Sequence, residues 1–184
     1  MDVPPTYADL RYAGASPVQT LDLYLPHEPT AAPLPLVVVI HGGAFLMGDK
    51  RSEITAIPTL LEHGYAIASL GYRLSGEAPF PAAVQDCKAG LRWLSAHADA
   101  YGLDRARFAL WGASAGGHLA AMLGVTGDQP TIFDATSDPS VDASVAAVID
   151  WFGPTRFLAM DAHHRERPPT GEPAFLPPWP REHD

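Results

Sequence analysis

Cysteine and basic residues are scarce in this 184-residue sequence, and each scarcity excludes a class of protein. The one cysteine, Cys87, can form no internal disulfide, which favours a reducing, cytoplasmic location. Lysine and arginine together number 12, against 21 for aspartate and glutamate, and the net charge is -9. Because few cations are available to neutralise phosphates, nucleic acid is not an expected partner.

Long apolar runs are also missing. Runs such as residues 36–40 are far shorter than the roughly 20 residues that a membrane-spanning helix needs, and MDVPPTYADL at the start resembles no secretory signal. We therefore expect a soluble chain with no membrane partner. The sequence contains no P-loop, no GxGxxG and no cluster of His, Cys and carboxylates at metal-ligand spacing, so we expect neither cofactor nor metal.

Apolar runs of strand length recur along the chain. Four of them lack alternation and predict strands that are buried on both faces: residues 34–40, 65–73, 107–111 and 145–151. Two more strands are predicted before these, near residues 7–13 and over residues 20–25. The second of the two alternates apolar and polar residues as a half-buried strand does. These two predict an antiparallel opening.

Helical patterns separate the predicted buried strands. The clearest covers residues 81–101, where apolar positions step by three and four, with Pro81 suited to the first turn and Gly102 to the stop. Shorter helices are predicted over residues 55–63 and 118–125. This alternation predicts an α/β fold with a mostly parallel sheet, right-handed crossovers and helices on both faces.

The last 20 residues break the pattern. Residues 165–184 contain prolines at 168, 169, 173, 177, 178 and 180. Because proline lacks a backbone donor and breaks helices, this tail cannot supply a central strand, and we expect it to be extended or disordered. A role as a proline-rich ligand for an aromatic groove is the alternative. The predicted organisation is a domain over residues 1–164 followed by this tail.

The stretch LWGASAGGHLAA contains GxSxG, with Ser114 at its centre. Five residues of this kind also occur by chance, so the flanking elements decide what the pattern means. Here a buried strand precedes the pattern and a helix follows it, which is the context of a nucleophile elbow. The small residues then permit a sharp, strained turn that lifts the hydroxyl above the sheet edge. We predict Ser114 as the nucleophile.

A second glycine-containing loop, His41-Gly42-Gly43-Ala44, follows a different buried strand. A glycine pair lets backbone N–H groups approach a substrate oxygen without an intervening side chain. Together with the N–H of Ala115, donors from this loop could hold the negative charge of a tetrahedral intermediate. The loop therefore predicts an oxyanion hole, with His41 as its support.

These motifs resemble those of the α/β-hydrolase carboxylesterases, near the hormone-sensitive-lipase-like and the bacterial feruloyl or acetyl-xylan esterase groups. The resemblance runs to about residue 164, through LDLYLP, VVVIHGGAF, GYRLS, FPAAVQDCKAGLRWL, FALWGASAGGHLAA and VIDWFGPT. It implies the α/β-hydrolase fold and a serine nucleophile. By position it implies Gly43, Ala44 and Ala115 as oxyanion donors, while Gly42 shapes the turn. Ala44 stands where the family often has a third glycine.

The resemblance also implies a triad acid and histidine from loops after the last strands, in the order nucleophile, acid, histidine. The sequence ends before such loops. We expect a shortened or frame-altered product without the C-terminal strands of the fold, and an exposed sheet edge through which the chain could self-associate.

Local residues offer weak substitutes for the missing triad members. Asp150 ends the last predicted strand, on the edge where catalytic groups gather, and is a candidate acid. His163 is a candidate base, and His164 a further one, only if their segment folds back. We expect His118 to pack rather than act as a base.

Three functional classes follow. The first and favoured one is a serine hydrolase of short-chain, aryl or carbohydrate esters, inactive or weak as this chain. The second is a non-catalytic binding module derived from the fold. The third is an amide hydrolase similar to kynurenine formamidase, against which Phe45 argues because tryptophan usually follows that loop.

Overall fold

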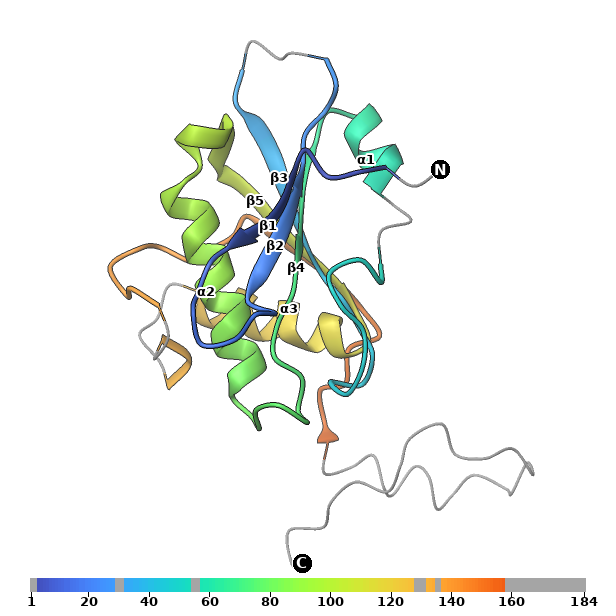
Figure 1. The fold of residues 1–184 in the computed structure, drawn as a ribbon, viewed down its shortest axis with the longest axis vertical. Coiled ribbons are helices and arrows are strands. Elements are labelled where there is room, and N and C mark those ends of the chain that lie inside the picture. Colours follow the sequence, from blue (N-terminus) through green and yellow to red (C-terminus); the bar gives the residue numbers. More distant parts are fainter. Residues whose placement is uncertain (1–2, 29–31, 54–56, 128–131, 135–136, 158–184) are drawn as a thin grey trace, which may run out of the picture. The chain divides into compact units, whose positions relative to one another are not determined.

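The structure is a computed structural model that describes residues 3–28, 32–53, 57–127, 132–134 and 137–157 (Figure 1). The chain divides into two compact units, Met1–Gly153 and Pro154–Asp184. All the helices and strands given below lie in the first unit. Of the second unit only residues 154–157 are described, so the predicted boundary at residue 164 and the proline-rich tail lie outside the described residues.

Six strands form one sheet in the order β1-β2-β4-β3-β5-β6. Their bounds are Tyr7–Arg11 (β1), Thr20–Tyr24 (β2), Leu34–Ile40 (β3), Ala66–Leu70 (β4), Leu103–Ala113 (β5) and Ala147–Trp151 (β6). Strand β2 pairs antiparallel with β1 and with β4, whereas β4, β3, β5 and β6 run parallel to their neighbours. The predicted antiparallel opening and mostly parallel sheet are confirmed.

Among the described residues, three α-helices cover the sheet: α1 (Ile57–Glu62), α2 (Ala82–Ala96) and α3 (Ala115–Thr126). Short 3₁₀ turns occur at Asp99–Tyr101 and Ile132–Asp134. Figure 1 shows α1 and α2 on opposite sides of the sheet. Alternate residues of β3 divide between two cores, as the pleat requires. Leu36, Val38 and Ile40 pack in the core of α2 and α3, and Val37 and Val39 pack in the core of α1. Helices on both faces are thus confirmed.

Three strands differ from their predicted burial. In β5 Phe108 and Leu110 are buried, but Ala109 and Trp111 are half-buried and Arg107 is exposed, although the sequence predicts burial on both faces.

All five residues of β2 are buried, although the sequence alternates, because both faces of the strand are covered. Leu21 and Leu23 pack in the core of α2 and α3, and Tyr24 packs in the core of α1. All five residues of β6 are exposed, although the sequence predicts a fully buried strand. Among the described residues β6 has β5 as its one strand neighbour, so it forms an edge of the sheet. No helix in the described ranges is long and apolar enough to cross a membrane.

Candidate active site

Ser114 lies in the turn between β5 and α3, with φ 55° and ψ -120°. L-residues rarely adopt a positive φ, and such strain persists only where the surroundings enforce it. Here the Ser114 N–H donates to the carbonyl of Trp151 (2.8 Å), and its carbonyl accepts from the N–H of His118 (3.1 Å). The end of β6 and the first turn of α3 therefore hold the sharp turn that the sequence predicts.

The motif glycines permit this turn because backbone segments meet at both positions. A Cβ atom on Gly112 would lie 2.2 Å from the carbonyl oxygen of Gly116. A Cβ atom on Gly116 would lie 2.0 Å from the carbonyl oxygen of Ile40, at the end of β3. The start of α3 thus packs directly on the neighbouring strand end, and no side chain larger than hydrogen fits between them.

The His41 loop lies beside this turn. In the sheet Ile40 pairs with Gly112, so both loops leave the same edge. A Cβ atom on Gly42 would lie 3.5 Å from the Cβ of Ser114 and 2.8 Å from the carbonyl oxygen of Ala113. The structure therefore brings together the two motifs that the sequence singles out.

The loop itself is a run of unusual backbone conformations. Its φ angles are 111° at Gly43, 54° at Ala44, 61° at Phe45 and 96° at Gly48. The Gly43 carbonyl accepts from the N–H groups of Leu46 and Met47 (2.9 and 3.1 Å). In the part of the chain that the structure describes, the N–H groups of Gly43 and Ala44 donate no hydrogen bond. These donors are therefore available to an acceptor from outside the chain.

His41 is packed into the base of the loop. The residue is 1% exposed, and its ring stacks on Tyr72 with the ring centroids 4.3 Å apart. The Nδ1 atom lies 2.8 Å from the Gly42 carbonyl oxygen, and the Tyr72 hydroxyl donates to the His41 carbonyl (2.8 Å). Burial lowers the pKa of His41 below its usual value, which favours a neutral ring. This geometry supports a structural role for His41.

Glu53 is a site residue that sequence reasoning missed. Its Oε1 accepts a hydrogen bond of 2.8 Å from the N–H of Gly42. Glu53 comes 11 positions after Gly42, outside both motifs, and no local pattern marks it. Only the path of the loop brings its carboxylate back to the start of the motif.

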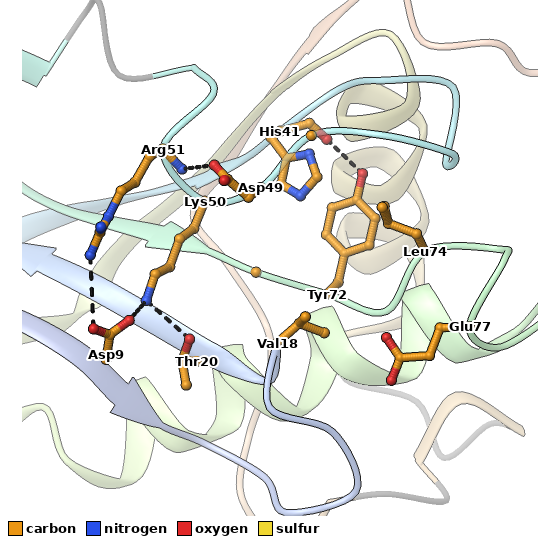
Figure 2. A pocket seen from close by; sticks show the side chains of 12 residues that line it. Asp9, Val18, Thr20, His41, Asp49, Lys50, Arg51, Tyr72, Leu74 and Glu77 are labelled. Carbon is orange, nitrogen blue, oxygen red and sulfur yellow. Dashed lines mark hydrogen bonds and ion pairs between the residues drawn. The ribbon is translucent and has the colours of Figure 1, made fainter.

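Behind the loop lies a cavity of about 290 Å³ (Figure 2). Its lining includes His41, Tyr72, Leu74 and Glu77, while Ser114 is not part of it. The cavity is therefore distinct from the position at which the serine hydroxyl would meet a substrate.

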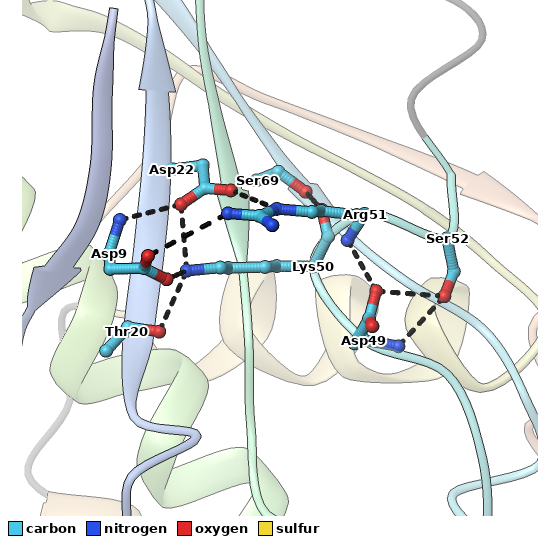
Figure 3. A network of polar contacts seen from close by, with 8 residues as sticks. All are labelled: Asp9, Thr20, Asp22, Asp49, Lys50, Arg51, Ser52 and Ser69. Carbon is cyan, nitrogen blue, oxygen red and sulfur yellow. Dashed lines mark hydrogen bonds and ion pairs between the residues drawn. The ribbon is translucent and has the colours of Figure 1, made fainter. Parts of the chain in front are cut away.

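A partly buried ion-pair network, shown in Figure 3, contributes Asp9, Lys50 and Arg51 to the lining of this cavity. Lys50 Nζ contacts a carboxylate oxygen of Asp9, Oδ1 of Asp22 (2.8 Å) and the hydroxyl of Thr20 (3.0 Å). Arg51 Nε donates to Asp22 Oδ2 (2.9 Å). Burial acts to raise the pKa of Asp22, but hydrogen bonds from the Asp9 N–H, Lys50 and Arg51 outweigh it and hold that pKa below its usual value. The network ties β1 and β2 to the loop.

The structure describes some of the candidate acid and base residues but not others. Asp150 Oδ1 accepts from the N–H of Gly153 (2.8 Å), so this carboxylate shapes the turn after β6. The His118 ring meets the Phe45 ring edge-on at 5.8 Å, a packing contact between α3 and the loop. His163 and His164 lie outside the described residues.

A mostly parallel sheet with a strained serine turn between strand and helix, beside a glycine loop from the next strand, defines a protein of the α/β-hydrolase fold. Comparison with known proteins is more specific. The chain belongs to the BD-FAE family, whose model matches residues 21–176.

Its relatives carry esterase names. The chain is 32% identical to esterase LipC of Mycobacterium tuberculosis over 76% of its own length, and 36% identical to esterase LipI of the same organism over 68%. It spans 35% and 41% of the lengths of these relatives.

Solved structures agree with this assignment of the fold. A truncated carbohydrate esterase from gut microbiota is 30% identical, with a TM-score of 0.77, over 88% of this chain and 63% of that one. Esterase B from Lactobacillus rhamnosis, inhibited by a tributyrin phosphonate, is 33% identical, with a TM-score of 0.69, over 80% of this chain and 49% of that one.

Proposed function

We propose that this chain carries the nucleophile and the oxyanion hole of a serine carboxylic-ester hydrolase. The observation that carries the proposal is the close approach of two motifs from neighbouring strands. Ser114 lies in a strained turn, and a Cβ atom on Gly42 would lie 3.5 Å from its Cβ. Esterase names among relatives and solved neighbours support the same class.

In the proposed reaction the Ser114 oxygen attacks the ester carbonyl carbon, and the carbonyl π electrons move onto oxygen. The N–H groups of Gly43, Ala44 and Ala115 would donate to this oxyanion, where losing one donor typically costs about 3 kcal/mol of barrier. Collapse of the intermediate breaks the bond to the alcohol, which takes a proton and leaves an acyl-serine. Water then attacks the acyl-serine, releasing the acid and restoring the serine hydroxyl.

A base is needed to take the serine proton, and the candidates for this role have the least structural support. Asp150 bonds to its own turn, and His163 stays a prediction outside the described residues. Sites reduced to an oxyanion hole and binding contacts retain roughly 10³ to 10⁴-fold acceleration over water. We therefore expect very slow hydrolysis of p-nitrophenyl acetate by this chain.

The substrate class we propose is a short-chain, aryl or carbohydrate ester, handled without cofactor, in the cytoplasm. The esterase names support ester over amide chemistry, so an activity like that of kynurenine formamidase is not favoured. The competing hypothesis is a non-catalytic binding module, which would share the fold but would not have a reactive serine.

The test is covalent labelling by a fluorophosphonate probe, followed by peptide mapping. We expect slow label on Ser114, in keeping with the slow hydrolysis expected without a placed base, no label in Ser114→Ala, and the same slow label in Ser140→Ala, which alters an exposed serine in another loop. Label that persists in Ser114→Ala would sink the assignment. Fast turnover that disappears in both Asp150→Ala and His163→Ala would instead show that these residues complete a triad.

A further inference from the structure

The carboxylate of Glu53 lies at the base of the glycine loop, next to the serine turn. Its Oε1 accepts from the Gly42 N–H at 2.8 Å. A Cβ atom on Gly42 would lie 2.9 Å from this same oxygen and 3.5 Å from the Cβ of Ser114. The Glu53 carboxylate and the Ser114 side chain thus both lie close to the Gly42 position.

A negative charge at this place does not help to stabilise an oxyanion. Two like charges a few ångströms apart repel, and the effect grows where water is excluded. A purely electrostatic role would therefore favour a cation here, or no charge. What the carboxylate does supply is a strong acceptor, because a hydrogen bond from N–H to an ionised oxygen is roughly twice as strong as a neutral one.

The acceptor acts on the peptide at which the glycine loop begins. Gly42 is followed directly by Gly43 and Ala44, whose φ angles of 111° and 54° leave the most populated region. Without a contact that fixes Gly42, this strained run could relax and turn its N–H groups away from the serine. Fixing the Gly42 N–H anchors the start of the segment that carries the next two donors.

We propose that Glu53 is a positioning residue, which holds the oxyanion loop against the Ser114 turn through the Gly42 N–H. This inference rests on the proposed function for the reaction that it serves, but the hydrogen bond can be tested separately. The alternative role for a carboxylate so close to a serine is that of a general base.

Two substitutions separate the roles. Glu53→Gln keeps an oxygen that can accept from Gly42 but removes the charge and the basicity, whereas Glu53→Ala removes all three. Glu62→Gln, at an exposed glutamate of α1, is the matched control. The readouts are the rate of fluorophosphonate labelling of Ser114 and the amide resonance of Gly42 in protein labelled with ¹⁵N-glycine.

We expect Glu53→Gln and Glu62→Gln to label within about twofold of the wild-type rate. Glu53→Ala should label on the order of 10 to 100-fold more slowly, because a misplacement of about 1 Å costs about that much. The Gly42 amide proton should move upfield in Glu53→Ala, which loses the acceptor, and by a smaller amount in Glu53→Gln, which keeps a neutral one.

Three results would overturn the inference. An equal loss of labelling in Glu53→Gln and Glu53→Ala would make Glu53 a base, and unchanged labelling in Glu53→Ala would remove the positioning role. A Gly42 amide insensitive to both variants would remove the hydrogen bond. If the amide responds as expected but Ser114 takes no probe in any variant, the proposed function fails while the contact between Glu53 and the loop stands.

Discussion

At the scale of single residues, the packing of the site depends on a glycine, Gly116, that has no Cβ atom. The first turn of α3 approaches the end of β3 so closely that a Cβ on Gly116 would lie 2.0 Å from a carbonyl oxygen. The atoms that it would meet are backbone atoms of an inner strand, which cannot rotate away as a flexible side chain can. Gly116 is therefore required for the packing of the serine turn, independently of any chemistry.

Gly116→Ala tests this requirement. Alanine is the better helix former by about 1 kcal/mol, so propensity alone predicts a gain in stability. The clash with the Ile40 carbonyl should outweigh it, because overpacking costs about 1–3 kcal/mol even where side chains can adjust. We expect the free energy of unfolding in urea to fall by about 2 kcal/mol.

Gly14→Ala is the control for this variant, because nothing lies within 4 Å of a Cβ at that position. It should leave stability unchanged or raise it slightly through the entropy of the unfolded chain. A Gly116→Ala protein as stable as the wild type would show that the serine turn tolerates a side chain there.

At the scale of elements, one lysine joins the antiparallel part of the sheet to the glycine loop. Lys50 follows the loop in sequence, yet its ammonium group lies among Asp9 of β1 and Thr20 and Asp22 of β2. Its backbone carbonyl accepts from the Ser69 hydroxyl of β4. This lysine therefore sets where the chain after Gly48 runs, and with it the position of Glu53.

Lys50→Met should be strongly destabilising. Asp22 is fully buried, and removal of one partner from a buried ion pair typically costs about 3–5 kcal/mol. We expect a loss of about 3 kcal/mol in urea unfolding, since Arg51 still bonds to Asp22. Arg51→Met should cost clearly less, because the Arg51 side chain is 54% exposed. Equal losses from the two variants would contradict a special role for Lys50.

At the scale of the whole molecule, the described part of the sheet has an apolar edge strand, β6. Val148, Ile149 and Trp151 of β6 are 38%, 42% and 51% exposed, and the adjoining Phe152 is 79% exposed. Within the described residues this strand pairs with β5 alone, so one row of its backbone groups has no strand partner. An exposed apolar edge strand is a template for pairing with another chain.

We predict that purified chains self-associate through this edge. In sedimentation velocity the wild type should show a mass that rises with concentration, and Ile149→Lys should reduce that rise, because a charge opposes burial of the edge. Val18→Lys is the control: Val18 is 40% exposed and precedes β2, toward the opposite end of the sheet. A monomer at every concentration, or identical behaviour of both variants, would contradict the prediction.

Short-range sequence patterns were sufficient to predict most helices and strands and the two glycine-containing motifs. The apolar run at Leu34–Ile40 coincides with β3, and the stepping of apolar positions by three and four locates α2, with a 3₁₀ turn over its expected last residues. The glycines around Ser114 and the turn between strand and helix were readable for the same reason. The spacing of apolar residues, the stiffness of the chain and the small size of glycine all act between residues that are close together in the sequence.

What sequence by itself determined, then, is the alternation of strands and helices, the serine turn and the glycine loop. Tertiary structure alone decided that β2 is an inner strand and β6 an edge, that Lys50 is paired with Asp22, and that Glu53 returns to Gly42. Strand order and these contacts join segments far apart in the chain. Which of them form depends on the burial and pairing of the whole sheet, and no local pattern carries that information.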